Sequence, residues 1–152
     1  MPFRLSGLSA EPFRHLYGLP DAELEALGVR RLLADDSAPC RITLANAPVG
    51  SPVLLLNYEH QAAPSLYRGS GPIFVSEGAL ETGSTDIIPD SFRARIYSAR
   101  SYASDGWMID ADVAAGTDLE ALIDRLFAGP DVAYLHLHHA RRGCYSCRVD
   151  RA

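Results

Sequence analysis

Short runs of apolar residues, interrupted by turn residues, follow one another along most of the chain and predict strands rather than long helices. The strand-like runs of the first half cover residues 3–8, 29–33, 41–44, 53–60 and 72–76. The run Val53–His60 is continuously apolar at its start and then turns polar. This pattern is typical of a strand that is buried on both faces and then emerges at a site or in solvent. Residues 77–90, rich in Gly, Ser, Thr and Asp, are expected to be loop.

Two hairpins are predicted in the second half. Ser104-Asp105-Gly106 separates strand-like runs over 93–102 and 107–113, and Asp-Gly is a frequent hairpin turn. The last two runs, 132–140 and 143–150, are joined by Arg141-Arg142. With a two- or four-residue turn, strand alternation sets His139 opposite Cys144, His138 opposite Tyr145 and His136 opposite Cys147. A three-residue turn would shift the register and separate the patch formed by His136, His138, Tyr145 and Cys147.

One helix is strongly indicated. Residues 117–128 begin with a capping box, in which Thr117 and Glu120 can satisfy each other's backbone N–H groups, and continue with a single apolar stripe. Shorter helical turns are expected over 9–18 and 20–28. The chain is therefore predicted to be one α+β domain over 1–152, with a mainly antiparallel, strongly curled sheet, one well-defined packing helix and short N-terminal helices. Closure of the sheet into a barrel is left open.

The amino-acid composition excludes several classes of function. A length of 152 residues suits one domain, and a net charge of −5 argues against nucleic-acid binding. All 14 basic residues are Arg, so chemistry that needs a lysine Schiff base is excluded. No run approaches the ~18–20 apolar residues of a membrane span, and the N-terminus lacks the apolar core of a secretory signal. We expect a cytoplasmic monomer or homodimer without a disulfide framework, since there are three cysteines.

The chain resembles a bacterial family known as domain of unknown function 1203. The resemblance rests on the stretches FRLSGLSAEPF, APCRITL, VLLLNYEHQ, SLYRGSGPIFV and AYLHLHHARRGCYSCRVDR, which together cover most of the chain. It implies a small bacterial protein but no particular activity or cofactor. In that family the closing motif often reads His-x-His-Asn, and a small residue often occupies the position of Cys147. His139 and Cys147 depart from this pattern, which weakens any role that depends on them.

Polar residues follow the apolar starts of two strands: VLLL leads into NYEH, and VAYL leads into HLHH. If these strand ends meet, they form a cleft lined by His and Arg that suits a small anionic ligand or a protein partner. The residues expected to line it are Asn57, His60, Arg68, His136, His138 and Arg148. The alternative is a small hydrolase- or transferase-like enzyme, with His136 or His138 as acid–base and Cys147 or a metal assisting.

Two groups of residues could bind a metal ion, but a simpler interpretation accounts for each of them. His136-x-His138 with Cys144-x-x-Cys147 supplies zinc-type ligands, but on a regular strand the two sulfurs point to opposite faces. An ordinary polar sheet face is the simpler interpretation. Asp110 and Asp112 share a strand face where a hard cation could bridge them, although a half-solvated strand has the same pattern. The sequence therefore predicts no metal and no cofactor.

Overall fold

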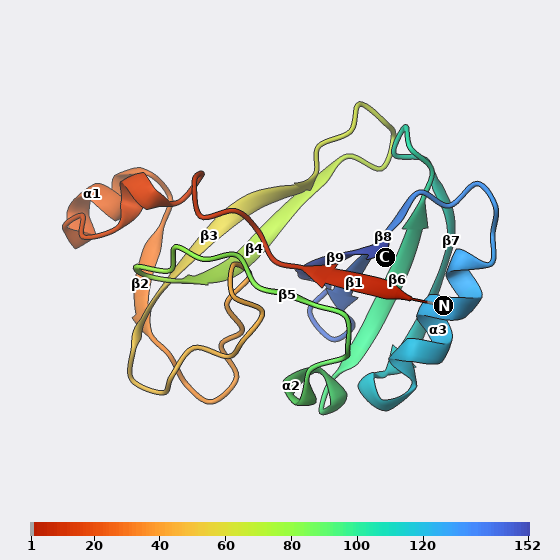
Figure 1. The fold of residues 1–152 in the computed structure, drawn as a ribbon. Coiled ribbons are helices and arrows are strands. Elements are labelled where there is room, and N and C mark those ends of the chain that lie inside the picture. Colours follow the sequence, from red (N-terminus) through yellow and green to blue (C-terminus); the bar gives the residue numbers. More distant parts are fainter. Residues whose placement is uncertain (1) are drawn as a thin grey trace.

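In residues 2–152, which the computed structural model describes, nine strands form two antiparallel sheets with few helices (Figure 1). The larger sheet has the strand order β5–β1–β9–β8–β6–β7. Its strands are β1 (Phe3–Ser6), β5 (Ser84–Thr85), β6 (Ile96–Tyr102), β7 (Met108–Ala115), β8 (Tyr134–His139) and β9 (Tyr145–Arg151). The smaller sheet has the order β2–β3–β4, formed by β2 (Arg30–Leu33), β3 (Pro52–Gln61) and β4 (Gly69–Ser76). The helical segments are η1 (Arg14–Leu16), α1 (Asp21–Ala26), α2 (Asp90–Arg93), η2 (Gly116–Asp118) and α3 (Leu119–Phe127).

The larger sheet buries one face under α3. The apolar stripe of α3 is buried against alternate residues of the strands, including Ala99, Leu135 and Leu137. Figure 1 shows the helix lying along β6 and β7, on the side of the molecule away from the smaller sheet. Because strand residues alternate between faces, the next residues of β8, His136 and His138, are directed to the opposite face.

The smaller sheet packs toward that opposite face. Leu54, Leu56 and Tyr58 of β3 belong to a second core cluster that also contains Phe13 and Tyr145. Since Tyr145 is the first residue of β9, this cluster joins the two sheets. The end of β3 is thereby placed beside the imidazole-bearing face of β8.

The expected fold class is confirmed: the chain is α+β and mainly antiparallel, with α3 as the well-defined helix. The strands form two sheets rather than one, and the larger sheet is open, with β5 and β7 at its edges. Among residues 2–152, no helix combines the length and the apolar character needed to cross a membrane.

Two local predictions are wrong. Residues 41–44 form turns instead of a strand, and Leu44 has a φ of 67°. Within these turns the Leu44 N–H donates to the Cys40 carbonyl at 3.1 Å, and Arg41, only 3% exposed, donates from Nε to the carbonyl oxygen of Tyr145 at 2.7 Å. The Thr117 capping box is also absent: α3 has no side-chain cap hydrogen bond at its N-terminus, and Glu120 pairs with Arg93 instead.

Candidate functional site

The C-terminal hairpin presents two imidazoles on one face. A four-residue turn keeps His139 opposite Cys144, with the His139 N–H donating to the Cys144 carbonyl at 2.8 Å, and His138 opposite Tyr145. The register then shifts, so that Leu137 pairs with Cys147 and His136 pairs with Arg148. This bulge adds one residue to β9 and lets Tyr145 and Arg148 share a face with the two imidazoles.

The predicted pairing of His136 with Cys147 is wrong for the same reason. The bulge turns Cys147 toward the core under α3, where it is fully buried. Burial raises the pKa of its thiol to about 12. Cys147 therefore lies on the face of the sheet opposite to His136 and His138, and its burial disfavours the thiolate that the alternative mechanism needs.

The third imidazole comes from the smaller sheet. A register irregularity between Tyr58 and Gln61 ends the regular pairing of β3, and His60 lies in it. The ring centroid of His60 is 4.8 Å from that of His138 and 6.4 Å from that of His136. One ring nitrogen from each of the three residues lies within 4.8 Å of the other two. The structure thus brings together the two His-bearing strand ends, the condition on which the expected cleft depended.

Tyr145 holds the three imidazoles in place. Its ring is stacked on His60 at 5.7 Å and meets His136 and His138 edge-on at 5.1 and 5.8 Å. Burial raises the pKa of Tyr145 well above its ordinary value, so the ring stays neutral. Aromatic contacts of this kind restrict the ring orientations of the cluster.

The imidazoles are kept in their neutral form. Burial lowers the pKa of His136 to about 3 and that of His138 to about 4. It also lowers the pKa of His60, and the nearby guanidinium of Arg100 lowers the pKa of all three. His136 is 4% exposed and His138 is fully buried. Neutral imidazoles can each donate from one ring nitrogen and accept or coordinate at the other.

A cavity of about 440 Å³ opens beside the cluster. It is lined by His60, Gln61, Ala62, Ala63, Ser104, Ala133, Tyr134, His136 and Arg148. The Arg148 guanidinium lies over the Tyr134 ring, 4.2 Å from its centroid, and Gln61 Nε2 donates to the Tyr134 hydroxyl at 3.0 Å. The volume falls in the range of small-molecule sites.

Two residues predicted for the cleft lie elsewhere. Asn57 is exposed and, by strand alternation, is on the face of β3 opposite to Tyr58. Arg68 is 60% exposed and pairs with Glu59, its Nε lying 3.0 Å from Oε2. Of the predicted set, the structure brings together His60, His136, His138 and Arg148.

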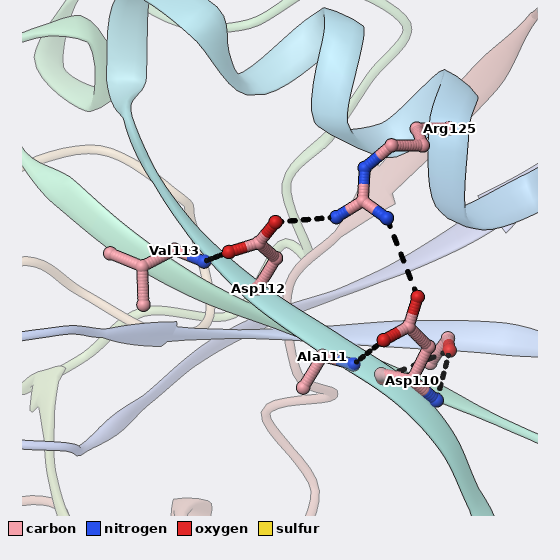
Figure 2. Close-up of polar contacts among 6 residues, drawn as sticks. Asp110, Ala111, Asp112, Val113 and Arg125 are labelled. Carbon is pink, nitrogen blue, oxygen red and sulfur yellow. Dashed lines mark hydrogen bonds and ion pairs between the residues drawn. The ribbon is translucent and has the colours of Figure 1, made fainter.

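Asp110 and Asp112 do share one face of β7, but the cation between them is a side chain. Arg125 of α3 reaches both carboxylates, with Nη2 at 2.6 Å from Asp112 Oδ2 and Nη1 at 3.4 Å from Asp110 Oδ2 (Figure 2). This supports the half-solvated strand that the sequence favoured.

The reasoning from the sequence did not place Tyr134, Gln61 or Arg100 at the site. Tyr134 could have been included, since it alternates in phase with His136 and His138 on the same strand. Gln61 is only 3% exposed, and it turns inward because of the irregularity at the end of β3, for which no residue pattern is diagnostic. Arg100 pairs with His136 because β6 lies next to β8, and the order of strands cannot be read from the chain.

Comparison with known proteins identifies a family. The family described as "Protein of unknown function (DUF1203)" matches residues 37–151, which include all three imidazoles of the cluster and Arg148. No curated protein and no solved structure matches the chain.

Proposed function

Since the chain belongs to the DUF1203 family, described only as proteins of unknown function, we propose from the site itself that the protein binds a small oxyanion in the cavity beside His60 and His136. A carboxylate or a phosphate group has the required charge and the hydrogen-bond acceptors. The observation that carries the proposal is the lining of the cavity, which contains a guanidinium, two imidazoles, an amide and two hydroxyls but no carboxylate.

Charge around the cavity favours an anion. Arg148 lines it, and Arg100 is close enough to lower the pKa of His60, His136 and His138. Within residues 2–152, Arg100 forms no ion pair with a carboxylate. The guanidinium groups of Arg148 and Arg100 therefore place positive charge beside the cavity, although Arg148 pairs with Asp150 and the whole chain carries a net charge of −5.

Arg148 is placed to contact a ligand. Its Nε and Nη2 donate to Asp150 at 2.8–3.0 Å, and these bonds and the stacking on Tyr134 hold the guanidinium plane in place. The Asp150 bonds leave Nη1 for another acceptor. An oriented guanidinium loses less conformational entropy on binding than a mobile one.

Cytoplasmic localisation in a bacterial cell is part of the same proposal. It is supported by the three cysteines, which are all free thiols, as expected in a reducing compartment, and by the family resemblance.

The test is titration of the chelator-treated protein with inorganic phosphate and with acetate, followed by NMR of the Arg side-chain and His ring signals. We expect saturable shifts at the cavity, and Arg148→Met to weaken binding by about tenfold or more, because a charge-assisted hydrogen bond is lost. Arg68→Met is the matched control, since Arg68 does not line the cavity and pairs with Glu59, and this variant should leave the affinity unchanged. Absence of saturation with both anions, or equal effects of the two variants, would overturn the proposal.

A further inference from the structure

The three imidazoles have an unusual deficit of hydrogen-bond partners. In the described part of the chain, no protein group bonds to the buried atoms His60 Nδ1, His136 Nδ1 and His138 Nε2. Buried polar atoms in proteins are nearly always satisfied, and leaving one unsatisfied costs free energy. Here three such atoms belong to residues that share one cluster. A common partner that accepts lone pairs would satisfy them together.

The hydrogen bonding of His138 fixes which of its nitrogens is available. Its Nδ1 lies 2.9 Å from the carbonyl oxygen of Gly143. A carbonyl can only accept, so Nδ1 carries the proton and Nε2 keeps its lone pair. A backbone carbonyl that orients a histidine in this way is a recurring support of metal-binding imidazoles.

The donor set suits a borderline transition metal. Three neutral imidazoles supply nitrogen ligands only, because Cys147 faces the core under α3 and no carboxylate lines the cavity. Hard ions such as Mg²⁺ and Ca²⁺ prefer oxygen, whereas Zn²⁺ commonly takes three His ligands plus one open position. In a tetrahedral zinc site the ligand nitrogens lie about 3.3 Å apart. The three nitrogens lie within 4.8 Å of one another, so each pair has to approach by at most about 1.5 Å to reach this spacing.

We propose that His60, His136 and His138 bind one divalent transition-metal ion, with Zn²⁺ as the best match, and that its remaining coordination position faces the cavity. His60 and His136 both line that cavity, so a ligand inside it reaches the metal directly. The inference deepens the proposed function, since the oxyanion would then be bound by the metal and by Arg148 together.

The experiment is calorimetric titration of the chelator-treated full chain with Zn²⁺, with Mg²⁺ as the comparison ion. We expect one Zn²⁺ per chain, no Mg²⁺ binding, and an affinity reduced at least about a hundredfold in His60→Ala and in His136→Ala, because a metal ligand is lost. His139→Ala is the matched control: His139 is next to His138 in sequence, has a buried unpartnered nitrogen, and contacts the Tyr97 ring on the opposite face, with the ring centroids 5.3 Å apart.

A second measurement does not depend on the variants folding. Co²⁺ added to the wild-type protein should produce the visible absorption of a four- or five-coordinate ion, and phosphate should alter that spectrum. Three results would overturn the metal site. They are binding of less than one Zn²⁺ per chain, a Co²⁺ spectrum typical of an octahedral ion, and a loss of Zn²⁺ affinity in His139→Ala as large as that in His60→Ala.

The two proposals can fail separately. Phosphate binding to the chelator-treated protein without any Zn²⁺ binding would support the anion site and remove the metal. Zn²⁺ binding with a Co²⁺ spectrum that phosphate leaves unchanged would support the metal and remove the anion as its ligand.

Discussion

Two polar clusters of the molecule, one on the edge of the six-stranded sheet and one between the two sheets, differ in whether the chain supplies all their hydrogen-bond partners. In the first, Arg125 bridges Asp110 and Asp112, and the second oxygen of each carboxylate accepts a backbone N–H, from Ala111 and Val113, at 2.8 Å (Figure 2). Because β7 is an edge strand, these N–H groups have no neighbouring strand to bond to, and the aspartates satisfy them.

The second cluster, His60, His136 and His138, is buried and incomplete. Each of its residues keeps a ring nitrogen without a protein partner, whereas the side chains of the Arg125 cluster are about half exposed and fully partnered. A completed surface cluster is explained by the fold alone. An incomplete buried cluster indicates a partner from outside the chain. The gathering of three unsatisfied nitrogens in one cluster, more than the presence of ionisable residues, separates a site from a structural feature.

The largest effect is expected from Tyr145→Ala. Tyr145 is 4% exposed and contacts all three imidazoles, so its removal leaves a cavity inside the incomplete cluster. We expect the free energy of unfolding to fall by about 3–5 kcal/mol in urea denaturation, as for other buried aromatic residues. Tyr145→Phe keeps the packing and serves as the control. A loss below about 1 kcal/mol in Tyr145→Ala would show that the ring does not support the cluster.

An intermediate effect on the free energy of unfolding is expected for the ion pair of Arg31 and Glu77, whose side chains are mostly buried. Glu77 has an exposed side-chain fraction of 13% and accepts from Arg31 Nη2 at 2.7 Å, which holds the pKa of Glu77 below its ordinary value. Glu77→Gln should cost about 1–2 kcal/mol near pH 7. A carboxyl with a lowered folded-state pKa stabilises the fold above its unfolded pKa, and this contribution is lost as the pH falls through the folded pKa.

The difference between wild type and Glu77→Gln should therefore shrink toward pH 3, measured by urea denaturation at a series of pH values. Glu11→Gln is the control, because Glu11 pairs with Arg14 at an exposed site. A difference that is constant with pH would refute the role assigned to the Arg31 hydrogen bond.

The smallest effect is expected from Arg125→Ala in the completed cluster. Arg125, Asp110 and Asp112 have exposed side-chain fractions of 51–56%, and exposed ion pairs contribute less than about 1 kcal/mol. Thermal denaturation at low and high salt should show a small loss that salt reduces further. The variant should bind Zn²⁺ as the wild type does. If the free energy of unfolding fell by several kcal/mol, the exposed Arg125 cluster would contribute as much to stability as a buried cluster, against this prediction.

The sequence by itself determined the local elements of this protein. Strand alternation placed His136 and His138 on one face, the apolar stripe predicted α3, and Asp105-Gly106 predicted the hairpin of β6 and β7. These features depend on residues close together in the chain, whose periodicity is set by backbone geometry.

Only the tertiary structure decided which residues meet. The bulge in β9 directs Cys147 to the core. The turns at residues 41–44 place the buried guanidinium of Arg41 against Tyr145, and the packing of β3 against β9 brings His60 to His138. These outcomes follow from contacts between segments up to about a hundred residues apart, and the pattern of any one segment does not encode them.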